Sequence, residues 1–172
     1  DTVWSVTAAN LTTALAAGVR LAGTLTVTGI ENGDETAALT AFTATATGAT
    51  SVTLTADGAW SVTGSTLKTA LDDGVRLVGT LAVTDIASGD ETGASTTFST
   101  TNTGATSVTL AAADGTLSVA ASTLRADLTS GIKYLGALTV TDISSGDEIA
   151  ALTAYTSAIT GATSVTLAAS DT

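Results

Sequence analysis

The seven residues GATSVTL stand at 48–54 and recur unchanged at 104–110 and 161–167. Within the first copy, Val52 and Leu54 alternate with small polar residues, which is the period-2 pattern of a half-buried β-strand. The phrase is too long to recur twice by chance in one chain of this composition. It therefore predicts a strand that occupies the same place in three successive repeats.

The repeat extends over the whole chain. The copies of GATSVTL are 56 and then 57 residues apart, and other columns keep this spacing. Trp4-Ser5-Val6, for example, returns as Trp60-Ser61-Val62 and as Leu117-Ser118-Val119. The sequence predicts three domains, which are repeat 1 at 1–58, repeat 2 at 59–115 and repeat 3 at 116–172.

The composition excludes several classes of protein. The 172 residues include no Cys, His, Met or Pro, so disulfides, the usual nucleophile–base pairs and zinc sites have no residues to use. We therefore expect no enzyme. A net charge of −11 repels nucleic acid, and no apolar run approaches the roughly 18 residues that a membrane-spanning helix needs. We expect neither nucleic acid nor membrane insertion, and this composition is typical of a bacterial extracellular protein.

The pattern within one unit, counted from GATSVTL at 48 to residue 103, predicts four strands and one short helix. SVTLTA (51–56) and WSVT (60–63) flank the turn residues ADG, so we expect them to pair as a β-hairpin. STLKTALDDGV (65–75) has the apolar spacing of one or two helical turns. RLVGTLAVTDI (76–86) resumes the alternation, and the Thr-rich stretch around Phe98 is expected to form a further strand.

These columns resemble a known family. The phrase TADGAWSVTGSTLKTALDDGVRLVGTLAVTDIASGDET (55–92) is similar to part of the bacterial Ig-like tandem repeat modules of large surface adhesins and biofilm-matrix proteins. The matching positions are Ala56, Asp57, Gly58, Trp60, Val62, Ala70, Leu71, Asp73, Gly74, Thr84, Asp85 and Gly89. The resemblance implies an all-β fold of small Ig-like β-sandwich units with one short helical crossover each, at the cell surface. The alternative is an all-β solenoid with three long rungs.

The position of GATSVTL also allows the repeat units to be divided at different boundaries. Counted from this phrase, complete units lie at 48–103 and 104–160, and 161–172 supplies the strand that 1–47 lacks. Either the chain is an excerpt of a longer array, or its last strand completes a neighbouring copy in a head-to-tail filament. In both interpretations the expected partner is a copy of the chain or an adjacent repeat.

Acidic turns occupy one column of the repeat, as ENGDE (31–35), DIASGDE (85–91) and DISSGDE (142–148). A Ca²⁺ ion needs several oxygen ligands, which such turns supply. The alternative is a solvated turn in which Gly shapes the backbone and the acid forms local hydrogen bonds. The predicted calcium ligands are Asp34, Glu35, Asp85, Asp90, Glu91, Asp142, Asp147 and Glu148.

The aromatic residues suit either a glycan-stacking surface or the core, and their places on alternating strands favour the core. They are Trp4, Trp60, Phe42, Phe98 and Tyr155. Taken together, the sequence predicts a non-catalytic structural repeat of a bacterial extracellular or cell-surface fibre or adhesin. The alternative function is calcium-dependent cohesion or glycan binding.

Overall fold

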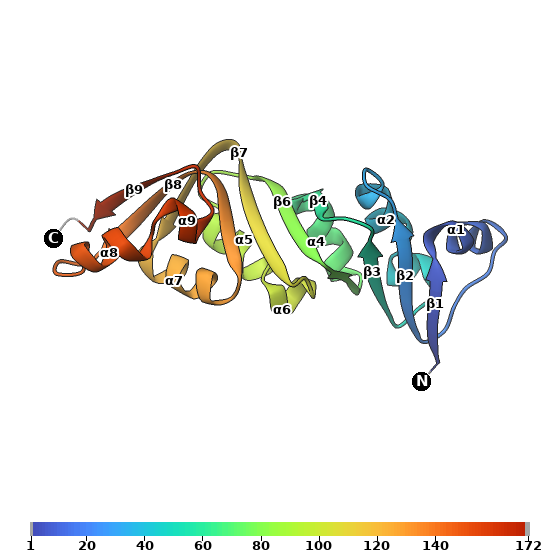
Figure 1. Cartoon of the computed structure of the whole chain (residues 1–172). Coiled ribbons are helices and arrows are strands. Elements are labelled where there is room, and N and C mark those ends of the chain that lie inside the picture. The colour runs from blue at the N-terminus through green and yellow to red at the C-terminus, as the bar shows by residue number, and fades with distance from the viewer. Residues whose placement is uncertain (1, 171–172) are drawn as a thin grey trace. The chain divides into compact units, whose positions relative to one another are not determined.

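The computed structural model describes residues 2–170, in which strands and helices alternate along the chain (Figure 1). Helices account for 36% of the residues and strands for 38%. None of the helices within 2–170 is long and apolar enough to cross a membrane. The elements in chain order are β1 (Val3–Thr7), α1 (Ala8–Ala16), β2 (Thr24–Ile30), α2 (Glu35–Ala41), α3 (Ala44–Thr47), β3 (Ser51–Ala56), β4 (Trp60–Thr63), α4 (Gly64–Asp72), β5 (Val75–Val78), β6 (Thr80–Ile86), α5 (Glu91–Thr97), α6 (Thr100–Thr103), β7 (Ser107–Ala120), α7 (Ala121–Thr129), β8 (Ile132–Ile143), α8 (Glu148–Ala154), α9 (Ser157–Thr160) and β9 (Ser164–Ala169).

The strands form two sheets, and each sheet keeps the order in which its strands occur in the chain. The first has the order β1-β2-β3-β5 and the second the order β4-β6-β7-β8-β9. β1, β2 and β3 lie side by side in Figure 1 and pair in parallel, as do β7, β8 and β9. Parallel neighbours need a crossover connection, and the helices between the strands provide it.

The chain divides into two compact units. Unit 1 comprises Asp1–Ala82 with Thr101–Thr106, and unit 2 comprises Val83–Thr100 with Ser107–Thr172. Each unit buries the Val and Leu columns of its own parallel strands, as expected for a parallel sheet covered by helices. These columns are Leu25, Val27, Val52 and Leu54 in unit 1, and Leu138, Val140, Val108 and Leu110 in unit 2.

The predicted all-β fold of Ig-like β-sandwich units is wrong. Helices α2, α5 and α8 occupy the stretches after the acidic turns, where the Thr-rich sequence predicts strands. Ala38, Leu39 and Phe42 are buried, a spacing that follows the turn of a helix and not a strand. The hydroxyl of Thr40 donates to the carbonyl oxygen of Thr36 at 3.0 Å, so Thr is satisfied within the helix. The all-β solenoid is wrong for the same reason, although the strands do follow one another in parallel.

The predicted hairpin between 51–56 and 60–63 is also wrong. One period further along the chain, the equivalent residues 107–112 and 117–120 are both part of β7, which runs through the ADG sequence without reversing. Gly115 of this sequence has φ +78°, and the pairing of β7 with β8 shifts register between Ala111 and Thr116. The ADG residues therefore form an irregularity within a continuing strand path and do not return the chain.

The predicted helix after WSVT is confirmed as α4. Its N-cap is Thr63, whose side chain accepts the backbone N–H of Thr66. Leu67 is fully buried on the inner face of the helix. Gly74 follows with φ +79°, the left-handed conformation in which helices commonly end.

The GATSVTL phrase marks the passage from a short helix into a strand. The buried Thr47 hydroxyl donates to the carbonyl oxygen of Thr43 at 2.8 Å and accepts the N–H of Ala49 at 3.3 Å. Gly48 ends α3 with φ +82°, and a Cβ there would stand 3.3 Å from the carbonyl oxygen of Leu21. The column therefore needs Gly for its backbone conformation.

Candidate functional site

The glutamate of each acidic turn begins a helix and closes the turn before it. The carboxylates of Glu35, Glu91 and Glu148 each accept the backbone N–H of the glycine two residues earlier, at 2.8 Å. Glu91 is buried and also accepts the backbone N–H of Ser118 at 3.1 Å. These three predicted calcium ligands therefore have carboxylate oxygens engaged by the backbone.

The aspartates of the same turns take two other positions. Those directly before α2, α5 and α8 form no side-chain capping bond to their helices, and they are Asp34, Asp90 and Asp147. Asp85 and Asp142 have φ of +60° and +55°, and Gly29 stands in the same column with +66°. This left-handed conformation favours Gly and admits Asp, so backbone geometry accounts for the residue types in this column.

A hollow recurs at the same place in the first and the third repeat. It lies between the first helix of the repeat, the end of the strand that follows and the helix after the acidic turn. Its volume is about 480 Å³ in the first repeat and about 280 Å³ in the third. In the third repeat Asp142 and Asp147 line the hollow together with Arg125. In the first repeat Gly29 and Thr12 replace Asp142 and Arg125.

The hollow does not assemble the predicted calcium ligands. In the third repeat it joins two of them to a cationic guanidinium, while the carboxylate of Glu148 is bonded to Gly146. Across residues 2–170 there is no group of three or more His, Cys, Asp or Glu side chains suited to hold a metal ion. Calcium binding stays a prediction, and the geometry assigns the glutamates to turn closure.

The aromatic columns pack into the core, as the alternation predicts. Phe42, Phe98 and Tyr155 are buried. Trp60 is 0% exposed, and its indole N–H donates to the carbonyl oxygen of Val78 at 3.0 Å. Trp4 forms the equivalent bond to the carbonyl oxygen of Ala22 at 2.9 Å but is 40% exposed. The inner Trp60 is therefore closed to a sugar. Trp4 differs because β1 has no preceding helix within residues 2–170, whereas α2 contacts β4.

Unit 2 contains a buried polar cluster that sequence reasoning missed. The hydroxyl of Tyr134 on β8 donates to the carboxylate of Asp127 on α7, and both side chains are buried. Ser95 on α5 hydrogen-bonds to the same pair. The signal lies in the repeat columns, where three apolar positions change together. The equivalent positions of unit 1 hold Leu39, Ala70 and Leu77.

Burial sets the protonation of this cluster. It raises the pKa of Asp127 above the ordinary value, while hydrogen bonds from Tyr134 and Ser95 act in the opposite direction. Burial, the hydrogen bond to Asp127 and the charge of Asp127 raise the pKa of the Tyr134 phenol well above its ordinary range. Among residues 2–170 no buried side-chain polar atom lacks a partner. The cluster is thus a satisfied network that packs α5, α7 and β8 together.

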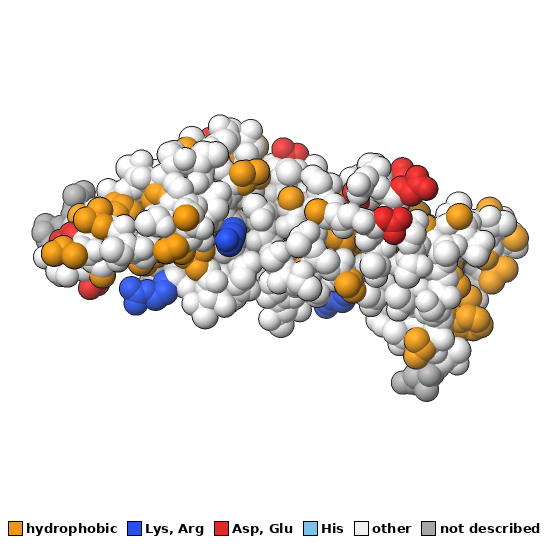
Figure 2. All heavy atoms as spheres, in the orientation of Figure 1, with side chains coloured by type: hydrophobic (Ala, Val, Ile, Leu, Met, Phe, Trp, Pro, Cys, Tyr) orange, Lys and Arg blue, Asp and Glu red, His pale blue; other side chains and the backbone are white. Residues whose placement is uncertain are grey.

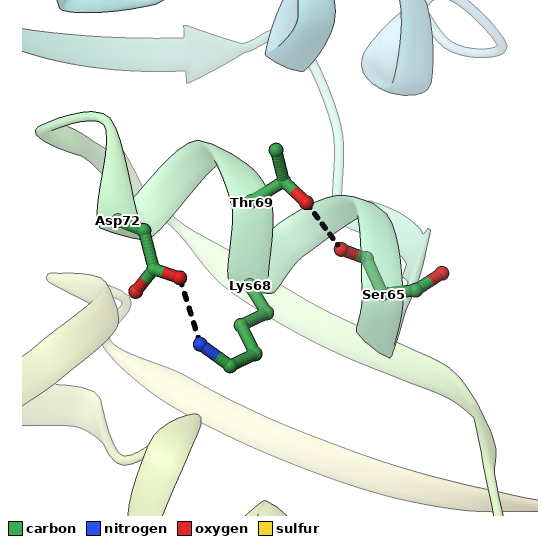
Figure 3. A network of polar contacts seen from close by, with 4 residues as sticks. All are labelled: Ser65, Lys68, Thr69 and Asp72. Carbon is green, nitrogen blue, oxygen red and sulfur yellow. Dashed lines mark hydrogen bonds and ion pairs between the residues drawn. The ribbon is translucent and has the colours of Figure 1, made fainter.

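The basic residues make local surface contacts. Figure 3 shows the exposed face of α4, where the Lys68 ammonium lies 2.7 Å from the Asp72 carboxylate. On the same helix the Thr69 hydroxyl donates to the carbonyl oxygen of Ser65 at 3.1 Å. An exposed pair of this spacing contributes about 0.3–0.5 kcal/mol to the helix. It supports α4 and does not form a binding site.

Exposed apolar side chains gather at the first and last strands. Figure 2 shows hydrophobic side chains over α1 and β1 and over α8 and β9. Leu152 on α8 is 66% exposed, whereas Leu39 at the equivalent position of α2 is 1% exposed. Trp4 and Trp60 show the same contrast between an outer and an inner member of one column. The exposed apolar residues at the first and last strands therefore occupy positions that adjacent elements cover in the inner copies of the repeat.

Comparisons with known proteins add no relative from which to argue. No family model matches the chain, and neither the curated proteins nor the solved structures give a match. The resemblance to adhesin repeat modules stays a prediction from the sequence, without the sandwich that it implies. A function for this chain rests on the geometry of its own repeats.

Proposed function

We propose that the chain is a non-catalytic structural repeat of a bacterial extracellular or cell-surface fibre or adhesin, whose repeats extend one another by β-strand pairing. One observation carries the proposal: the same column is buried inside the array and exposed at its first or last member. Leu39 is covered where α4 packs on α2, and Leu152 has no such cover within residues 2–170. Each repeat thus presents the surface that the next one needs.

The dependence of each repeat on packing against its neighbours supports a role in setting the length and shape of the protein. A repeat of about 57 residues buries too little surface to be stable alone, so it depends on its neighbours. In unit 1 the neighbour's contribution is α4 and β4 against α2. In unit 2 it is β7 against α5, where the backbone N–H of Ser118 in the third repeat donates to the Glu91 carboxylate in the second. The residues that recur most faithfully between the repeats are these packing residues and the turn glycines. Their proposed role is therefore mechanical.

The extracellular assignment is supported by composition. The chain lacks the oxidisable residues Cys and Met, and only 12% of its residues are charged. Its net charge of −11 keeps separate fibres apart through mutual repulsion. These properties suit a long, chemically inert surface protein.

The test is a series of tandem fusions of one, two and three copies. Joining Ser170 directly to Asp1 keeps the 57-residue spacing of the GATSVTL phrases, because Asp171-Thr172 occupies the same column as Asp1-Thr2. Each junction buries at least two large apolar side chains, worth about 3–6 kcal/mol together. At about 2–4 °C per kcal/mol we expect the melting temperature to rise by roughly 6 °C or more from one copy to two. Small-angle scattering should show an equal increase in maximum dimension per copy.

The matched control inserts a flexible Gly/Ser linker at the same junction. The linker no longer holds the copies in register, so they can pair only as separate copies do, and their melting temperature should rise less than that of the direct fusion. If the direct fusion and the linker fusion melt at the same temperature, the repeats do not support one another and the proposal is wrong.

A further inference from the structure

Residues 19–22 lack the strand that the equivalent residues of the later repeats form. In the second repeat these residues are β5, which pairs in parallel with β3, and Val52 lies opposite Val75. In the third repeat they begin β8, which pairs in parallel with β7, and Val108 lies opposite Ile132. The sequence at 19–22, Val-Arg-Leu-Ala, is nearly the same as Val-Arg-Leu-Val in β5, and the third copy is Ile-Lys-Tyr-Leu at 132–135. What residues 19–22 lack is the strand on which to pair.

The backbone before residues 19–22 already has the conformation of the paired copies. Gly18 has φ +81°, compared with +79° for Gly74 and +80° for Gly131. In the paired copies these glycines accept a hydrogen bond from the first valine of the neighbouring strand. The N–H groups of Val52 and Val108 donate to the carbonyl oxygens of Gly74 and Gly131, at 3.2 Å each. The Gly18 carbonyl is the equivalent acceptor.

Strand β9 lacks a paired strand on one side, and this complements the missing partner of residues 19–22. It carries the GATSVTL sequence, pairs with β8 and is the last strand of its sheet. The equivalent strand of the first sheet, β3, has β2 on one side and β5 on the other. Val52 and Leu54 of β3 are fully buried, whereas Val165 and Leu167 of β9 are only half-buried. The free edge of β9 thus has the pairing groups and the apolar positions that β5 covers on β3.

Helices α8 and α1 show the same complementarity as the two unpaired strand segments. Leu39 on α2 and Ala70 on α4 are both buried where these helices pack together in unit 1. The equivalent residues are Leu152 on α8 and Ala14 on α1. Leu152 is 66% exposed and Ala14 is half-exposed. The two uncovered residues are therefore the two halves of one contact that the chain already makes once.

We propose that residues 19–22 of a second copy of the chain add to β9 as a parallel strand, with Val165 opposite Val19 and Leu167 opposite Leu21. This inference rests on the proposed function and supplies the contact through which separate copies join. The occupant is a second copy because both the strand contact and the helix contact are completed by residues of this same sequence. Different surfaces of the chain meet in the contact, so it is heterologous and propagates into a filament unless the rotation closes a ring.

Net charge gives the contact a characteristic salt dependence. Each copy carries a net charge of −11, so two copies repel one another as they approach. Added salt screens this repulsion, while burial of apolar side chains is not weakened by it. Assembly should therefore increase with salt concentration, in contrast to a contact held by opposite charges.

Disulfide trapping tests the register directly, because the chain has no cysteine of its own. The pairing of Thr53 opposite Arg76 places Thr166 of one copy opposite Arg20 of the next. Both side chains are exposed, so Thr166→Cys and Arg20→Cys leave the folded chain intact. Mixing the two variants under mild oxidation should give the mixed disulfide. The matched control replaces Thr166→Cys by Ser164→Cys, which shifts the cysteine by about 6.6 Å along the strand and out of bonding range.

We expect the in-register pair to cross-link on the order of tenfold faster than the control pair. Equal rates for the two pairs would overturn the proposed register. A second pair of variants tests the apolar contact. Val19→Asp places a charge at a residue that is 45% exposed, and Val78→Asp does the same at a residue that is 43% exposed but lies outside the contact. In sedimentation at matched concentration and salt, only Val19→Asp should reduce the assembled fraction, whereas loss in both or in neither contradicts the inference.

The outcome is separable from that of the tandem fusions. A direct fusion that gains stability while separate copies stay monomeric at all salt concentrations retains the structural-repeat proposal and overturns this inference. A mixed disulfide that forms in register supports the inference, whatever stability a fusion gains.

Discussion

Tyr134→Phe removes one hydroxyl from the buried cluster of unit 2 and keeps the ring that fills the core. The hydroxyl donates to the Asp127 carboxylate, and a hydrogen bond to a charged group contributes about 1.5–3 kcal/mol. Both side chains are buried, so water replaces the lost donor poorly. Ser95 remains as a partner of Asp127 and limits the loss. We expect the free energy of unfolding to fall by about 2 kcal/mol.

The matched control is the apolar version of the cluster, which the chain already contains in unit 1. Ser95→Leu, Asp127→Ala and Tyr134→Leu together install the residues found at the equivalent positions. Replacing a whole buried polar network by well-packed apolar side chains is often neutral or stabilising, whereas removing one partner is costly. We therefore expect the triple variant to lie within about 1 kcal/mol of the wild type.

Urea unfolding followed by circular dichroism measures both variants, and hydrogen exchange of the β8 amides places the change in unit 2. The reasoning is refuted if Tyr134→Phe unfolds at the same urea concentration as the wild type. It is refuted equally if the triple variant loses more stability than the single one, because the cost would then come from packing and not from an unpaired carboxylate.

Four further predictions test contacts described above. Asp127 has a raised pKa in the folded chain, so its contribution is fully present below its unfolded value of 3.8 and is lost as pH rises through the folded value. The melting temperature of Asp127→Asn, relative to that of the wild type, should therefore increase as the pH rises above about 4, and a constant difference would contradict the assignment. Glu91→Ala should cost about 1–3 kcal/mol more than Glu148→Ala in urea unfolding, because the buried Glu91 carboxylate serves two backbone N–H groups. Trp60→Ala should cost about 3–5 kcal/mol and Trp4→Ala less than half of that, and equal thermal shifts would show that the first strand is covered in solution. Millimolar Ca²⁺ should leave the melting temperature unchanged because the turn glutamates are bonded to the backbone, whereas a saturating rise would support the predicted calcium site.

The individual strands and α4 follow from the sequence, but the direction in which strands pair does not. Val52 and Leu54 alternate in the same way in a parallel and in an antiparallel sheet, so the pattern predicts a strand and no partner. The ADG residues have the composition of a hairpin turn, and the continuous β7 shows that they only interrupt a strand. The error in pairing direction produced the error in fold class, because parallel strands require crossovers and antiparallel strands do not.

The missed helices and the missed cluster have different causes. In α5, Thr raises strand propensity and both Thr and Gly lower helix propensity, and tertiary packing overrides these preferences. A better signal is the Glu that begins each of α2, α5 and α8, since its carboxylate closes the preceding turn. The Tyr134 cluster leaves no local motif. It becomes visible only when Ser95, Asp127 and Tyr134 are compared with their columns in unit 1.

An array of nearly identical repeats risks mispairing while it folds, because the wrong neighbour offers almost the same apolar surface. The cluster of unit 2 removes part of this ambiguity. If α7 packed against α2 in place of α5, Asp127 would face Leu39 where Ser95 should be, and a buried carboxylate would lose a hydrogen-bond partner. The correct arrangement satisfies every member. A few polar atoms thus distinguish one junction from its copies, much as a single buried Asn fixes the register of a coiled coil.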